Sequence, residues 1–128
     1  MFAKEQPDLN WENPAVRAAV EVIMRYWLDK GIDGFRMDVI NFISKDTDLP
    51  DAPVTNTAST WQNGAQYYAC GPRLHEYLRD IGKILKEYNA FSVGEMPEIN
   101  DCDEILKVVG FDRGELSMIF HFELYVSP

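Results

Sequence analysis

Apolar residues recur at helical spacing in three stretches of this 128-residue chain, and each stretch carries helix signals at its ends. The first helix is expected to begin at Asn13-Pro14, because Asn can cap exposed amides and Pro suits the first turn. Gly31 is expected to end it. Its apolar stripe is taken to be Val16, Val20, Ile23 and Trp27.

A second helix is expected from about Pro72 to Tyr88, and a short third one at Asp103–Val109. The stripe of the second helix consists of Leu74, Leu78, Ile81, Leu85 and Tyr88.

Short strands are expected between and after these helices, at Gly34–Ile40, Phe91–Met96 and Leu116–Leu124. Strands that alternate with helices over brief returns are typical of parallel strands joined by helical crossovers. The fold class predicted from the pattern alone is therefore α/β.

One long stretch, Asn41–Gly71, has no clear periodicity and contains several Pro, Thr, Ser, Asn and Asp residues. Loops beyond about 12–15 residues are uncommon in compact domains and are often functional. This loop leaves the carboxyl end of the first strand, where parallel sheets and barrels place their sites. A surface insertion without a role is the alternative, and the function of the loop stays open.

The first strand places charges where a buried strand should be apolar. With the two-residue period of a strand, Arg36 and Asp38 share one face of Gly34–Ile40. Burying both is costly unless that face lines a polar site or the two charges pair. An ion pair within the strand is therefore as good an explanation as a functional site.

The second strand also ends on an acid, Glu95, and Gly94 beside it leaves room for a ligand or a neighbouring backbone. Neighbouring strands lie about 4.8 Å apart, so two successive parallel strands would bring Asp38 and Glu95 together. Carboxylates about 5–5.5 Å apart are typical of glycosidases that retain the anomeric configuration, whereas inverting enzymes need a wider gap. The pattern favours a retaining glycosidase.

The amino-acid composition limits the classes of binding partner. A formal net charge of −9 without clustered Lys and Arg argues against nucleic acid and against anionic membranes. No apolar run approaches the roughly 20 residues that span a bilayer, and Met1–Asn10 does not resemble a signal peptide. Cys70 and Cys102 are expected to be free thiols, so a cytoplasmic location is expected.

No cofactor and no metal site is predicted. His75 and His121 lack metal-ligand spacing, and no glycine-rich phosphate loop follows a strand. His75 is expected to be an ordinary helix side chain, whereas a lining role for His121 stays open. The aromatic residues of the long loop could either stack on sugar rings or pin the loop to the fold; they are Trp61, Tyr67 and Tyr68.

Several segments together resemble the α-amylase superfamily, glycoside hydrolase family 13, and within it the oligo-1,6-glucosidase and maltase group. They are Gln6-Pro7-Asp8-Leu9-Asn10, Gly34-Phe35-Arg36-Met37-Asp38-Val39-Ile40-Asn41, Gly71-Pro72-Arg73-Leu74-His75-Glu76-Tyr77, Ser92-Val93-Gly94-Glu95-Met96 and Arg113-Gly114-Glu115-Leu116. The resemblance covers about Phe2 to Glu123. It implies a partial (β/α)8 barrel, in which residues 1–128 form the central part of the catalytic domain from its third helix to its sixth strand.

The resemblance also implies roles for four residues: Asp38 and Glu95 are catalytic, and Arg36 and Val39 bind substrate. Asp38 matches the nucleophile, and Glu95 matches the general acid that later activates water. Arg36 matches the arginine that braces the nucleophile. Val39 matches the residue type that accompanies acceptance of α-1,6 bonds, where Thr accompanies α-1,4 preference. The implied substrates are short oligosaccharides with a terminal α-glucosidic bond, and α-1,4 activity stays open.

Some of the family's catalytic residues fall outside this chain, namely a His on the third strand and a His-Asp pair on the seventh. The chain by itself is therefore expected to be inactive. It is also expected to be unstable or to aggregate, because an excerpt with three strands has two open sheet edges. A trehalose-phosphate hydrolase of the same group is the main alternative. A non-catalytic partner of a membrane transporter is another, but such relatives lack the carboxylates that Asp38 and Glu95 supply here. The oligomeric state is not predicted.

Overall fold

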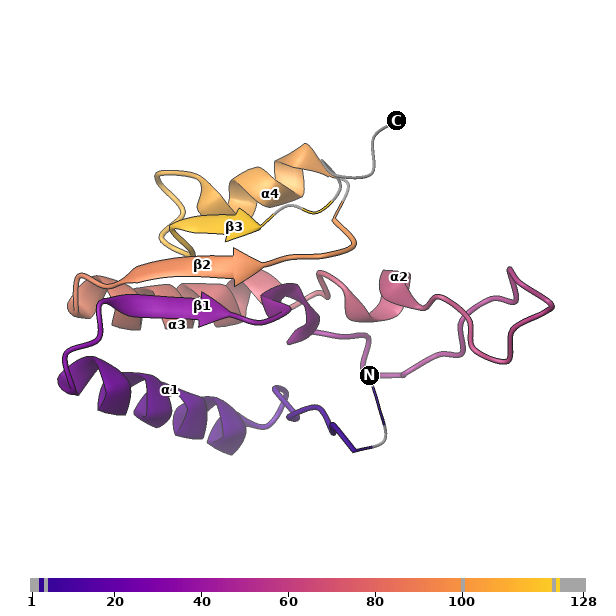
Figure 1. Cartoon of the computed structure of the whole chain (residues 1–128), viewed down its shortest axis with the longest axis horizontal. Coiled ribbons are helices and arrows are strands. Elements are labelled where there is room, and N and C mark those ends of the chain that lie inside the picture. The colour runs from indigo at the N-terminus through magenta and orange to yellow at the C-terminus, as the bar shows by residue number, and fades with distance from the viewer. Residues whose placement is uncertain (1–2, 4, 100, 121, 123–128) are drawn as a thin grey trace.

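A computed structural model describes residues 3, 5–99, 101–120 and 122. Its centre is a three-stranded parallel sheet in the order β1-β2-β3 (Figure 1). The strands are β1 (Gly34–Met37), β2 (Phe91–Glu95) and β3 (Met118–Phe120). Met37 pairs with Gly94, and Gly94 with Ile119, so the carboxyl ends of all three strands meet at one edge.

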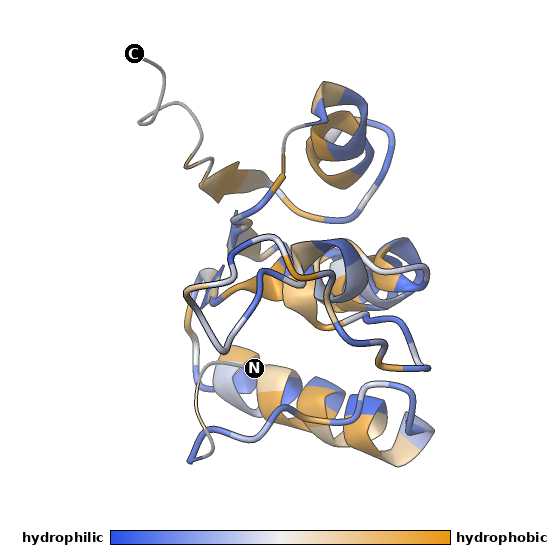
Figure 2. Cartoon of the chain, turned by 90° about the vertical axis from the view of Figure 1, so that its right-hand side faces the viewer, coloured by the Kyte–Doolittle hydropathy of each residue, from blue (hydrophilic) through white to orange (hydrophobic). Residues whose placement is uncertain are grey.

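One helix precedes the first strand and two others connect successive strands. All three cover one face of the sheet. They are α1 (Pro14–Asp29), α3 (Leu74–Glu87) and α4 (Cys102–Val109). Figure 2, which looks from the carboxyl ends of the strands, shows these helices along one side of the sheet. The predicted α/β class and the parallel strands are confirmed.

The stripe predicted for α1 is wrong in its second half. Met24 and Leu28 are buried, whereas Ile23 and Trp27 are 57% and 48% exposed. Both sets continue from Val20 at helical spacing, so the sequence alone offers two registers. The start of the helix is as expected, since the Asn13 side chain accepts a hydrogen bond from the Ala15 N–H at 2.9 Å.

The stripe predicted for α3 is confirmed, with four of its members buried and Tyr88 half-buried. It lies at the centre of a core between the helices and the sheet. The buried members of this core are Met24, Leu28, Ile40, Leu74, Leu78, Ile81, Ile84, Leu85, Met96, Ile99, Val108 and Leu116.

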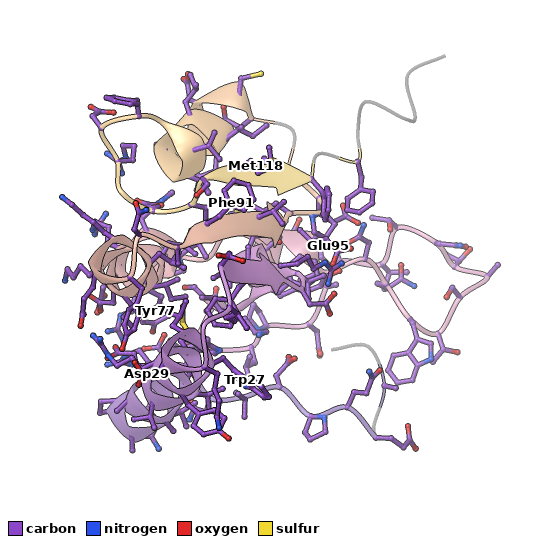
Figure 3. The ribbon with its side chains drawn as sticks, turned by 60° about the vertical axis from the view of Figure 1, so that its left-hand side comes forward. Trp27, Asp29, Tyr77, Phe91, Glu95 and Met118 are labelled. Atoms are coloured by element: carbon purple, nitrogen blue, oxygen red, sulfur yellow. The ribbon has the colours of Figure 1, made fainter. Side chains whose placement is uncertain are left out.

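The other face of the sheet is open. Phe91 on β2 is 50% exposed, and Met118 and Phe120 on β3 are 49% and 45% exposed. Figure 3 shows Phe91 and Met118 on their strands. This face also carries Arg36 and Glu95, because residues two apart in a strand share a face.

The long loop has some order. It begins with a 3-10 turn, η1 (Ile40–Phe42), and ends near a one-turn helix, α2 (Ala65–Tyr68). Its two ends are joined by backbone hydrogen bonds from Asp46 N–H to the Tyr67 carbonyl at 2.8 Å and from Gly71 N–H to the Ser44 carbonyl at 3.2 Å. The loop extends beyond the carboxyl ends of the strands (Figure 1).

Two strand boundaries differ from the prediction. β1 ends at Met37 and not at Ile40, because Val39 has a φ of 36° in the left-handed region and the chain turns into η1. β3 begins at Met118, two residues after the expected Leu116. The last residues of that expected strand, Glu123 and Leu124, lie outside the described residues.

Candidate active site

Three charged residues meet where β1 and β2 end; Arg36, Asp38 and Glu95 are called the edge cluster below. The Arg36 guanidinium donates from Nη1 to Asp38 Oδ1 and from Nη2 to Glu95 Oε2, the second contact at 2.6 Å. Figure 3 shows Glu95 at the end of its strand. The predicted convergence of the two carboxylates is therefore observed, and one cation holds both.

The ion pair that competed with a functional explanation is also present, between Arg36 and Asp38. It does not stand alone, because the same guanidinium reaches across to Glu95 on the neighbouring strand. Pairing within one strand would need no second carboxylate. The intra-strand ion pair is therefore confirmed, and it belongs to a larger cluster that joins two strands.

Backbone geometry adds a fourth contact. Val39, which was predicted to bind substrate, donates its N–H to Glu95 Oε2 at 3.3 Å. Its positive φ is uncommon for a β-branched residue, and such conformations concentrate at functional sites. The turn after Asp38 thus carries backbone strain and directs an amide at the second carboxylate.

The two carboxylates have different surroundings. The side chain of Asp38 is 73% exposed, whereas that of Glu95 is 18% exposed. The hydrogen bond from Arg36 is the main cause that holds the pKa of Asp38 below its usual value, and Glu95 adds to it. Asp38 is therefore ionised and accessible, as a carboxylate nucleophile must be.

Gly94 does not have the role that the sequence suggested. A Cβ at this position would lie 2.6 Å from a Leu116 methyl and 2.9 Å from an Ile40 methyl. Gly94 therefore makes room for core side chains on the helix-covered face, and the prediction of a ligand or backbone beside it is wrong. Close packing at this position holds β2 against η1 directly below the edge cluster.

The three aromatic residues of the loop differ in their contacts. Tyr68 packs edge-on against Phe42, with ring centroids 4.9 Å apart, and so joins the end of the loop to its start. Trp61 is 87% exposed and lines a cavity of about 810 Å³ together with Tyr67 and Tyr68. Stacking of these aromatic residues on sugar rings stays a prediction.

Sequence analysis missed a second ionic group, called the helix cluster below, which consists of His75, Arg79, Glu104, Arg113 and Glu115. His75 Nδ1 lies 2.8 Å from Glu115 Oε2, and His75 Nε2 lies 2.7 Å from Glu104 Oε1. Arg113 and Arg79 approach the other oxygen of Glu115 at 3.4 and 3.6 Å. His75 is therefore more than an ordinary helix side chain.

The signals for this cluster were two segments of the family resemblance, one with His75 and one with Arg113 and Glu115. Local pattern gave none, because the members lie far apart in the sequence. His121, whose role was left open, lies outside the described residues. Among the residues that the structure describes, no group of three or more His, Cys, Asp or Glu side chains could hold a metal ion.

The fold is one of parallel strands joined by helices, and two carboxylates meet at the carboxyl ends of the strands, where barrels place their sites. The family model for the catalytic domain of alpha amylase matches residues 1–127, and the chain belongs to this family.

Relatives that are named for an enzyme activity match nearly the whole chain. An alpha-glucosidase of Schizosaccharomyces pombe is 63% identical over 123 residues, which are 96% of this chain and 21% of that protein. An oligo-1,6-glucosidase of Parageobacillus thermoglucosidasius is 48% identical over 124 residues, covering 96% of this chain and 22% of that protein. The chain thus spans about a fifth of the length of these relatives.

Solved structures show the same arrangement. A trehalose-6-phosphate hydrolase of Bacillus licheniformis superposes with a TM-score of 0.81 at 40% identity, over 94% of this chain and 20% of that one. An isomaltulose synthase variant of Erwinia rhapontici NX5, in complex with its natural substrate sucrose, gives 0.84 at 35% identity, over 95% and 21%. The three described strands and their helices are part of a (β/α)8 barrel.

Proposed function

We propose that this chain carries the nucleophile and the acid/base of a retaining α-glucosidase. The observation that supports this most directly is the single guanidinium of Arg36 shared by Asp38 and Glu95 at the carboxyl edge of the sheet. A retaining mechanism needs two carboxylates on opposite sides of one glycosidic bond and close to each other.

In the first half of the reaction, Asp38 attacks the anomeric carbon and forms a covalent glucosyl ester. Glu95 donates its proton to the glycosidic oxygen as the bond to the leaving sugar breaks. In the second half, Glu95 takes a proton from water, whose oxygen attacks the same carbon and displaces Asp38. Two inversions give glucose with its α configuration retained, and Arg36 keeps Asp38 ionised at the start of each cycle.

The proposed substrates are short oligosaccharides with a terminal α-1,6 or α-1,4 glucosidic bond. Relatives named alpha-glucosidase and oligo-1,6-glucosidase support this class. Val39 follows the nucleophile and is proposed to favour α-1,6 bonds. Val39→Thr is then expected to raise the rate on maltose relative to isomaltose.

We further propose that residues 1–128 act as the central part of a longer catalytic barrel and do not turn over substrate by themselves. The open sheet face and the fifth of the relatives' length that the chain covers support this. A suitable test protein is a chimera in which the matching stretch of the S. pombe alpha-glucosidase is replaced by this chain. It is called the chimera below.

Covalent trapping tests the proposal. The chimera is incubated with 5-fluoro-α-glucosyl fluoride, digested, and analysed by mass spectrometry, with Asp38→Asn as the control. A glucosyl label on Asp38 and α-glucose as the first product by NMR are the expected results. A label on another residue, or β-glucose as the first product, would contradict the assignment.

A second candidate is hydrolysis of trehalose 6-phosphate, because the trehalose-6-phosphate hydrolase of B. licheniformis is 40% identical to this chain. The chimera and the S. pombe enzyme are compared on isomaltose, maltose and trehalose 6-phosphate. Turnover of the phosphorylated sugar above that of the two glucose disaccharides would favour this alternative.

Two thiols without a disulfide, Cys70 and Cys102, support a cytoplasmic site for the reaction. None of the helices among the described residues combines the length and the apolar character required to cross a membrane.

A further inference from the structure

Two hydrogen bonds tie the turn after β1 to the segment after β2. Backbone pairing between these strands ends with Met37 and Gly94. Beyond that pair, Val39 N–H reaches Glu95 Oε2 at 3.3 Å, and Asn41 Nδ2 reaches the Pro97 carbonyl at 2.7 Å. The link between the strands therefore continues past the ladder through one backbone amide and one side chain.

Asn41 is held firmly enough to act as such a link. It lies in η1, it is fully buried, and its carbonyl accepts the Cys70 N–H at 2.9 Å. Its Oδ1 has no hydrogen-bond partner among the described residues, so its contribution to this link comes from the Nδ2 donor. A buried amide costs free energy that an apolar residue of the same shape would not, which suggests that the donor has a use.

Pro97 explains why a donor is needed there. Proline has no N–H and cannot continue a parallel ladder, and Glu98 after it has a φ of 60°. On one side of Pro97, the Met96 N–H donates to the Phe120 carbonyl of β3 at 3.4 Å, and the Asn41 bond ties Pro97 itself to the β1 side. Glu95 is two residues before Pro97, so movement of this segment moves Glu95 relative to Asp38.

We propose that Asn41 is a positioning residue that holds Glu95 in reacting geometry with Asp38 by binding the Pro97 carbonyl. This rests on the proposed acid/base role of Glu95. Asn41 does not belong to the edge cluster and acts on the reaction through Pro97. Its loss should therefore lower kcat and change KM little.

The first test replaces Asn41 by leucine in the chimera, which keeps the branched shape of the side chain and removes the donor. Misplacement of a catalytic group by about 1 Å can cost about 100-fold in rate. We expect kcat per trapped active site to fall about 10- to 100-fold, with KM within about threefold. An unchanged kcat per trapped site would overturn the proposal, and normalising to trapped sites removes any effect of misfolded enzyme.

A second variant, Asn41→Asp, separates positioning from packing. Burial raises the pKa of the introduced carboxyl, and only its neutral form can donate to the Pro97 carbonyl. Its kcat relative to the parent should therefore recover as the pH falls from 8 to 5, whereas the ratio for Asn41→Leu stays flat. Parallel pH profiles for the two variants would argue against a role for the donor.

Cys70→Ala is the matched control, because Asn41 Nδ2 also lies 3.7 Å from Cys70 Sγ. It should leave kcat within about twofold of the parent. A loss equal to that of Asn41→Leu would assign the effect to loop packing and overturn the proposal. If Asp38→Asn and Glu95→Gln still turn over substrate, the proposed function itself fails, and this inference fails with it.

Discussion

The edge cluster and the helix cluster are built from the same kinds of side chain but differ in exposure. In the edge cluster, Asp38 is 73% exposed although it pairs with Arg36. In the helix cluster, the Glu115 side chain is 0% exposed and contacts His75, Arg79 and Arg113. A buried carboxylate enclosed by cations stabilises a fold, whereas an accessible one can react.

The number of cations that each carboxylate contacts also differs between the clusters. In the edge cluster a single guanidinium serves two carboxylates, which leaves oxygens on both acids available to a ligand. In the helix cluster Glu104 is shared by Lys107 and His75, whose hydrogen bonds keep its pKa low although burial alone would raise it. The presence of charge alone therefore does not separate the two clusters, but the ratio of acids to cations and their exposure do.

The largest effect is expected from removing the nucleophile. Asp38→Asn in the chimera should lower kcat at least about 1,000-fold, because the covalent step is lost. The unfolding temperature should change by less than about 2 °C, since exposed pairs contribute about 1 kcal/mol or less. Steady-state kinetics and scanning fluorimetry measure the two quantities. Substantial activity in this variant would remove the distinction between the clusters.

Glu115→Gln is the opposite case. It removes a buried carboxylate that contacts His75, Arg79 and Arg113, and we expect about 2–3 kcal/mol of lost local stability. Hydrogen exchange of the peptide around residues 110–117 measures it. Activity per trapped active site should stay within about twofold. A loss of activity without faster exchange would mean that the helix cluster also serves the chemistry.

Gly82→Ala should have a smaller effect on the same region. A Cβ on Gly82 would lie 1.9 Å from the Gly114 carbonyl oxygen, so α3 and the segment that holds Glu115 must separate. Overpacking of this kind costs about 1–3 kcal/mol. Gly64→Ala is the control, because its Cβ would meet nothing closer than 3.5 Å. Equal exchange rates for both variants would show that the contact is easily relieved.

The sequence was most informative where a residue departs from the pattern of its strand or where a helical pattern admits one register. Arg36, Asp38 and Glu95 were found because charges on a buried strand are costly, and the stripe of α3 because its period admits one register. The register of α1 was not found, since Ile23 and Met24 both fit a helical period.

Contacts between distant segments that are not paired strands could not be predicted from pattern. Glu115 and His75 are 40 residues apart, and Asn41 and Pro97 are 56 apart, so nothing local marks either pair. Gly94 was noticed for the right reason, the lack of a side chain, but what fills the space is set by Leu116 and Ile40 from other elements. Tertiary packing decides such cases, and one sequence does not specify it.

The smallest expected effect concerns a carboxylate of intermediate exposure. Glu12, whose side chain is 37% exposed, accepts hydrogen bonds from the Tyr77 hydroxyl at 2.8 Å and from Arg73. The Tyr77 bond is the main cause that lowers the pKa of Glu12 below its usual 4.5. Because the pKa is lower in the folded state, the stabilisation is complete above pH 4.5 and is lost as the pH falls through the folded pKa.

Glu12→Gln should therefore destabilise the chimera by at most about 1 kcal/mol at pH 7, and the difference in unfolding temperature should shrink at pH 4. Tyr77→Phe removes the main donor, so a double-mutant cycle of the two changes measures their coupling. If burial sets the value of a carboxylate contact, this coupling should be smaller than the cost of Glu115→Gln. A coupling as large as that cost would show that the number of hydrogen bonds, and not exposure, separates the two clusters.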